Sequence, residues 1–280
     1  MSTAHILLLG AIAGGTIFLG LPMGRLQNLA PQARAGLSAL ATGILIFLLW
    51  DVLKGAEEPI GSALEERHWG TFWWLALVGL AGFTAGLMSL VYYSEWMRKK
   101  AQRRSSTLVG PGAAAVDEFE SRSFIEGLTP GKQLALLIAV GIGVHNFGEG
   151  LAIGQAAAAD QISLAVTLIV GFSLHNATEG FGICGPMSGE GSRPSWGFLA
   201  VLGAIGGAPT FFGTLLGQAW SSEAATVIFF AVAAGSILYV VQELFAVNRK
   251  YGHTVLVTWL VLAGLVLGFA TDFVIEAAGV

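Results

Sequence analysis

The chain has 280 residues, of which 54% are hydrophobic and only 11% charged, with a mean hydropathy of +0.71. A soluble domain carries about 25% charged residues, so this composition excludes one and predicts an integral membrane protein. The apolar runs are long and continuous, which favours helices; the strands of a membrane barrel would alternate over about ten residues. The net charge of −4 decides little, and we expect no nucleic-acid partner.

Long apolar runs predict eight membrane-spanning helices, each near the ~20 residues that are needed to cross the hydrocarbon core. The first run has no basic stretch before it and is long enough to span, so no cleavable signal peptide is expected. The single cysteine, Cys184, excludes an internal disulfide. We expect a single transmembrane domain over 1–280, with spans at about 6–24, 35–53, 69–96, 133–159, 161–187, 195–219, 224–247 and 254–273.

Basic residues indicate the orientation, because loops rich in Lys and Arg stay in the cytoplasm. With eight spans, alternate loops share one side, and the loops after the odd-numbered spans hold twelve of the 14 basic residues. Both termini are therefore expected outside. The longest hydrophilic segment, about 98–131, is then a cytoplasmic loop, most simply a flexible linker whose basic start lies on anionic lipid headgroups.

Spans four and five carry the same polar motif, His145-Asn146-Phe147-Gly148-Glu149-Gly150 and His175-Asn176-Ala177-Thr178-Glu179-Gly180. On a helix, His at i and Glu at i+4 share a face, and the Asn at i+1 lies about 100° around. Each motif is about 20 Å along its helix, near mid-depth. Two such helices side by side would gather two imidazoles, two carboxylates and two amides, which predicts a metal site.

A single buried His–Glu pair has a plainer explanation, a hydrogen-bonded lock between neighbouring helices. Ionisable groups in a span cost roughly 2.5–3.5 kcal/mol each on insertion scales, so they need a partner or a function. Two copies in adjacent spans, with His, Asn and Glu in the same order, favour the metal site over the lock.

A paired H-N-x-x-E-G motif in consecutive membrane helices resembles the ZIP (Zrt/Irt-like) metal transporters, of the bacterial type. The resemblance covers nearly the whole chain. It implies a 3+2+3 plan, in which spans one to three and six to eight are inverted copies around the central pair. The sequence itself only permits this plan: Asp51, late in span two, corresponds to Glu243, late in span seven.

The resemblance also implies the ligands. His145, Glu149, His175 and Glu179 would form the primary site, and Asn146 and Asn176, with the same two glutamates bridging, a second one. Imidazole with carboxylate suits zinc, iron(II), manganese, cobalt or cadmium, whereas calcium and magnesium prefer oxygen ligands alone. Asp51 and Glu243 are candidates for the ion path; for both, a surface ion pair is the plainer alternative.

Two departures from the family pattern affect these expectations. ZIP motifs commonly place proline before the glutamate, where this chain has Gly148 and Thr178. The family also often has a glutamate before a proline in span six, where this chain has Ala208 before Pro209. We therefore expect one principal metal, with the second site weak or absent.

The leading hypothesis is a divalent-metal transporter in the cytoplasmic membrane, most simply for zinc uptake, with the metal as cargo and no catalytic cofactor. An intramembrane metal-dependent hydrolase shares the buried His and Glu, but no H-E-x-x-H motif is present. A receptor or structural membrane protein is the third alternative. The pattern leaves the oligomeric state open, a homodimer included.

Overall fold

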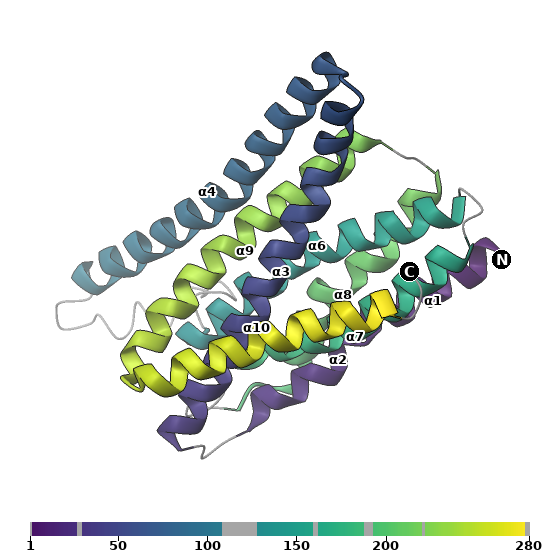
Figure 1. Cartoon of the computed structure of the whole chain (residues 1–280). Helices are drawn as coiled ribbons and strands as arrows, with labels where there is room; N and C mark the ends of the chain where they lie inside the picture. Colours follow the sequence, from purple (N-terminus) through teal and green to yellow (C-terminus); the bar gives the residue numbers. More distant parts are fainter. Residues whose placement is uncertain are drawn as a thin grey trace.

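The computed structural model describes residues 2–26, 30–107, 128–158, 162–187, 193–219 and 222–277, and every regular element in them is helical. In chain order the elements are α1 (Thr3–Gly15), α2 (Ile17–Gly20), the 3-10 turn η1 (Leu21–Arg25), α3 (Pro31–Glu65), α4 (Trp69–Thr107), α6 (Pro130–Ala158), α7 (Ile162–Cys184), the 3-10 turn η2 (Gly185–Met187), α8 (Trp196–Ala219), α9 (Glu223–Tyr251) and α10 (Thr254–Ala277). The start of α1 and the end of α10 lie at the same end of the bundle (Figure 1).

Within the described residues, six helical stretches are long and apolar enough to cross a membrane: Thr3–Arg25, Pro31–Glu65, Trp69–Trp96, Gly131–Ala158, Trp196–Ala219 and Glu223–Tyr251. A shorter apolar helix follows at Thr254–Ala270. The second motif lies on α7, a helix of 23 residues. The expectation of an all-helical membrane protein is therefore confirmed, while the count of eight spans stays a prediction.

Two helices continue well beyond the expected spans. The second span was expected to end at residue 53, but α3 runs to Glu65, so Asp51 lies inside a long helix and not in its last turns. Likewise α4 runs to Thr107, so the long loop does not begin at residue 98, and residues 108–127 lie outside the described part. The extra turns are rich in Glu, Lys, Arg, Ala and Leu, which favour helix in water as well as in lipid.

The helices form two groups. One group consists of α1, α2, α6, α7 and α8, with α6 packed along α8. The other consists of α3, α4, α9 and α10, where α4 lies along α9 and α10 along α3 (Figure 1). The groups meet where α9 contacts α6 and where α3 contacts α7, and a continuous core of aliphatic side chains fills this seam.

The second group is held by two crossings of the same design. At the crossing of α3 and α10, a β-carbon on Gly43 would collide with the carbonyl of Val261, and one on Gly264 with the carbonyl of Leu40. Each glycine thus faces the carbonyl three residues before the opposite glycine. Small residues of this kind let membrane helices approach until their backbones touch.

The crossing of α4 and α9 repeats this arrangement residue for residue. A β-carbon on Gly86 would collide with the carbonyl of Val232, and one on Gly235 with that of Phe83. The offset of three residues is again present on both sides. Gly235 of α9 therefore occupies the place that Gly43 has in α3, and Gly86 of α4 the place of Gly264 in α10.

The first group contains the same arrangement between α2 and α7 and between α6 and α8. In the second of these it occurs twice, since Gly154 and Gly217 face the carbonyls of Thr214 and Leu151. Gly20 of α2 and Gly180 of α7 face the carbonyls of Ala177 and Ile17. Gly213 of α8 and Gly150 of α6 face the carbonyls of Phe147 and Thr210. Gly150 and Gly180 are the last residues of the two polar motifs, so these crossings set the spacing of the motif helices from α8 and α2.

The repeated crossings make helices within each of the two groups equivalent by position. α1 and α2 correspond to α8, α3 to α9, α4 to α10, and α6 to α7. Gly43 and Gly235 are 192 positions apart, as are Asp51 and Glu243 and the first residues of α3 and α9, Pro31 and Glu223. This is the pairing that a 3+2+3 repeat requires.

One polar contact ties the end of the first helical stretch to the start of α8. The guanidinium of Arg25 lies 4.5 Å from the ring centroid of Trp196, a cation–π contact, and its Nη1 donates a hydrogen bond to the carbonyl of Pro194 at 2.5 Å. A second tie lies deeper, where Gly14 and Gly207 face one another's carbonyls. The first stretch and α8 are thus joined at two levels.

Candidate metal site

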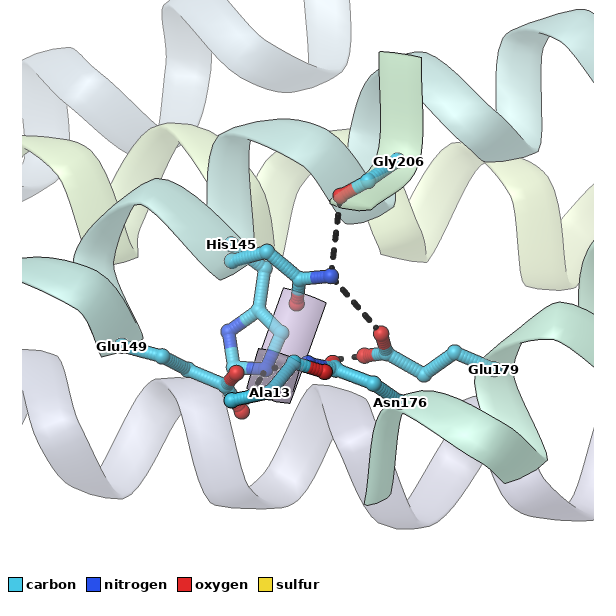
Figure 2. Close-up of polar contacts among 7 residues, drawn as sticks. Ala13, His145, Glu149, Asn176, Glu179 and Gly206 are labelled. Atoms are coloured by element: carbon cyan, nitrogen blue, oxygen red, sulfur yellow. Dashed lines mark hydrogen bonds and ion pairs between the residues drawn. The ribbon is translucent and has the colours of Figure 1, made fainter. Parts of the chain in front are cut away.

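The two polar motifs lie near the middle of α6 and α7, and their described His, Asn and Glu side chains are buried. Relative exposure is 1% for His145, 1% for Glu149 and 0% for Glu179. The Nε2 atom of His145 is 3.2 Å from Oε1 of Glu149, one turn along the same helix, and 3.7 Å from Oε1 of Glu179 on α7. Figure 2 shows the imidazole between the two carboxylates.

The two motif asparagines make equivalent bonds to main-chain carbonyls. Asn146 Nδ2 donates to the carbonyl of Gly206 on α8 at 2.9 Å, and Asn176 Nδ2 donates to the carbonyl of Ala13 on α1, also at 2.9 Å. Asn146 Nδ2 donates in addition to Oε2 of Glu179 at 3.0 Å, which holds that carboxylate toward His145. Each Oδ1 is buried and accepts no hydrogen bond from the described residues, so both amide oxygens remain available to a cation.

A helix break lies near one of those two carbonyls and a proline near the other. The first stretch breaks at Thr16, whose Oγ1 lies 2.7 Å from both the Ala13 and the Ser173 carbonyls, so one hydroxyl proton is shared between them. In α8, Pro209 lies inside the helix and has no N–H to donate to the carbonyl of Ile205, one residue before Gly206. Thr16 and Pro209 each lie three residues beyond the carbonyl that the motif asparagine uses.

Asp51 is brought close to the motif cluster. It is half-buried in α3 and interacts electrostatically with His145, Glu149 and Glu179. Asp272 of α10 also acts on it. An acid in the apolar helix after span seven was the available signal, but its approach to Asp51 depends on the Gly43–Gly264 crossing.

Glu243 lies elsewhere. Its carboxylate and the hydroxyl of Ser94 both hydrogen bond with Tyr239, at the contact of α9 with α4. Asp51 and Glu243 thus occupy equivalent positions in α3 and α9. Among the described residues, only Asp51 of these two interacts with the motif side chains.

The remaining motif side chain, that of His175, lies outside the described residues, as does that of Thr178. Among the side chains that are described, no group of three or more His, Cys, Asp or Glu is arranged so that it could hold a metal ion. The distances do fit pairwise. Two ligand atoms on one tetrahedral zinc, each about 2.0–2.1 Å from the ion, lie roughly 3.3 Å apart, between the two distances measured from His145.

Buried carboxylates and an imidazole at mid-helix, in an all-helical membrane protein, are typical of a multi-pass protein that carries ions. A bare carboxylate is costly in such a place unless a cation compensates it.

Comparison with known proteins assigns the family. A sequence model of the ZIP Zinc transporter family matches residues 115–276, which include both motifs, so the chain belongs to the ZIP family. The chain is also 28% identical over 271 residues to the Zinc transporter ZupT of Corynebacterium glutamicum, covering 92% of this chain and 94% of that protein.

Family membership decides between the classes that the sequence left open. The chain is a multi-pass metal transporter of the cell membrane and not an enzyme, so the hydrolase alternative is wrong. The resemblance of the paired H-N-x-x-E-G motif to ZIP transporters is confirmed. The identity of the residues that hold the metal stays a prediction. The distances from His145 to Glu149 and to Glu179 are close to the separation of two ligand atoms on one zinc ion.

Proposed function

We propose that the chain carries zinc into the cytoplasm and that the ion binds between α6 and α7 at the two motifs. The observation that carries this proposal is the approach of Glu149 and Glu179 to a single imidazole nitrogen of His145, with all three side chains buried. In the absence of a cation, two carboxylates so close together repel one another in a low-dielectric setting.

In this proposal, His145, Glu149, His175 and Glu179 are the primary ligands. Asn146 positions Glu179, and Asn146 and Asn176 offer their Oδ1 atoms at the edge of the site. Mixed nitrogen and oxygen ligands favour zinc and, with similar chemistry, iron(II), manganese, cobalt and cadmium over calcium or magnesium.

The proposed topology has eight spans in a 3+2+3 inverted repeat with both termini outside. Two arguments support it: the distribution of basic residues, and the glycine crossings that repeat between the first and last three spans. The acidic end of α3, with Glu57, Glu58 and Glu65, is then outside. Asp51, with Asp272, lies on the outer approach, and Glu243 lies at the equivalent place on the inner side.

We further propose one tightly held ion per chain. A second divalent ion a few ångströms from the first needs bridging carboxylates. At the second site Asn146 and Asn176 are neutral, and α8 has Ala208 where an acid would be expected. Repulsion between the two ions is then offset by Glu149 and Glu179 alone.

Flux measured with purified protein in sealed vesicles tests the function. We expect saturable zinc uptake, and its loss to background in each of His145→Ala, Glu149→Ala, His175→Ala and Glu179→Ala, with membrane insertion unchanged. Thr258→Ala is the matched control, because this exposed hydroxyl on α10 donates to the Thr254 carbonyl of its own helix. Uptake by Glu149→Ala at the level of the unmodified chain would exclude the proposed site.

A further inference from the structure

A single aromatic ring covers one side of the candidate metal site. Phe230 of α9 lies with its ring centroid 6.2 Å from that of the His145 imidazole, at 51° between the ring planes. A β-carbon added to Gly148 would lie 3.2 Å from this ring, and one added to Gly55 of α3 would lie 3.4 Å from it. The ring therefore fills the gap where α3, α6 and α9 meet, and two glycines leave the room for it.

The ring lies toward the outer end of the seam. On α3, Gly55 is one turn beyond Asp51, in the direction of Glu65. On α6, Gly148 is three residues beyond His145, in the direction of Ala158. Under the proposed topology both directions lead outside, so an ion that approaches His145 between α3 and α6 meets Phe230 first.

The equivalent place in the inner half is polar. The relation that matches Gly43 with Gly235 and Asp51 with Glu243 matches Ser38 with Phe230. Ser38 is 1% exposed, and its Oγ has no hydrogen-bond partner among the described residues.

Two more polar side chains surround this serine. Thr42 Oγ1 donates to the Ser38 carbonyl at 2.8 Å and accepts from Asn248 Nδ2 at 2.9 Å. The Oδ1 atom of Asn248 is buried and likewise accepts no bond from the described residues. Two halves with the same backbone crossings thus differ in lining: an aromatic ring on one side, and hydroxyl and amide groups on the other.

We propose that Phe230 is the outer gate of the metal site, closed in the conformation described here. An aromatic ring offers no oxygen to replace the hydration shell of a divalent ion, so the ion passes only when the ring leaves Gly148 and Gly55. The inner polar group of Ser38, Thr42 and Asn248 supplies such oxygens on the other side. This inference rests on the proposed function for its direction, outside to inside.

The test measures access to the site with a reporter thiol below the ring. His145→Cys, on the inner side of the ring, in a background with Cys184→Ala, is exposed in right-side-out vesicles to a membrane-impermeant cationic methanethiosulfonate. We expect Phe230→Ala to raise the outside labelling rate at least tenfold. Phe229→Ala is the matched control, because its ring packs against Phe147 at 4.6 Å between centroids and not against His145; it should change the rate less than twofold.

Phe230→Leu guards against a folding defect in the alanine variant. This smaller apolar side chain should give an intermediate rate, and size-exclusion chromatography reports whether each variant is monodisperse. A folded Phe230→Ala or Phe230→Leu variant that is labelled at the same rate as the chain with Phe230 would overturn the gate. A rate increase with Phe229→Ala equal to that with Phe230→Ala would overturn it as well.

The labelling needs no transport, so the gate and the proposed function can fail separately. Flux that persists in the four alanine variants of the motif rejects the function, whatever the labelling shows. If flux is lost in those variants and the outside labelling rate does not change on substitution of Phe230, the site is supported and the gate is rejected.

Discussion

Asn146 and Asn176 bind two different helices in the same way: each donates its side-chain amide to a main-chain carbonyl at 2.9 Å, that of Gly206 in one case and of Ala13 in the other. The difference between them is one bond, since Asn146 also donates to Glu179. This pair therefore separates the effect of a nearby amide from the effect of orienting a ligand.

The first prediction uses that difference. Asn146→Ala releases the Glu179 carboxylate and should raise KM for zinc about tenfold or more, in the range of groups that orient metal ligands. Asn176→Ala removes an amide without freeing a carboxylate and should raise KM by a smaller factor. Concentration-dependent uptake into vesicles measures both. Equal KM values for the two variants would show that the bond to Glu179 has no role in binding.

A second prediction concerns topology. In a chain with Cys184→Ala, a cysteine at Ser62, near the end of α3, should react with an impermeant thiol reagent added to intact cells. A cysteine at Ser105, near the end of α4, should react only after the membrane is opened. Labelling of the Ser105→Cys chain from outside would reverse the proposed orientation.

Metal stoichiometry gives a third prediction. Purified chain equilibrated with zinc should retain one tightly bound ion, measured by elemental analysis against protein concentration. Ala208→Glu adds the acid that span six lacks and should raise the retained zinc toward two ions per chain. Anomalous scattering from cadmium-soaked crystals offers an independent count. Two fully occupied peaks in the unmodified chain, both touching Glu149 and Glu179, would contradict the expectation of one.

The fourth prediction tests the glycine crossings. Gly213→Ala would drive a β-carbon into the Phe147 carbonyl, so it should destabilise the fold by roughly 1–3 kcal/mol, as overpacking does. Gly15→Ala is the control, because nothing lies within 4 Å of a β-carbon there. The midpoint of thermal aggregation in detergent, followed by size-exclusion chromatography, should fall for the first variant only. A midpoint unchanged by Gly213→Ala would mean that α6 and α8 are not in contact at this point.

Hydropathy was sufficient to predict an all-helical membrane protein but not where each helix ends. Apolar runs mark where lipid surrounds a helix, whereas α3 continues to Glu65 and α4 to Thr107 through residues that form helix in water. The position of Asp51 within its helix was misjudged for this reason.

The motif spacing placed His145 and Glu149 on one face, because i and i+4 are local on a helix. Partners on other helices were not accessible in this way. The bonds from Asn146 to Gly206 and from Asn176 to Ala13 need α8 and α1 at backbone contact distance, and glycines far along the chain set that distance. Phe230 was missed for the same reason: an aromatic residue in an apolar span has no local signal that separates a gate from a lipid-facing ring.

The two ties between the first helical stretch and α8 have a mechanical consequence. Arg25 is attached to Trp196 and Pro194 at one end, and Gly14 meets Gly207 further along, so neither rotation about one contact nor sliding along the axis leaves both intact. The pair should behave as a rigid body during the transport cycle. The distance between spin labels on α1 and α8 should then stay the same throughout the cycle, whereas labels on α8 and α9 should show two distances.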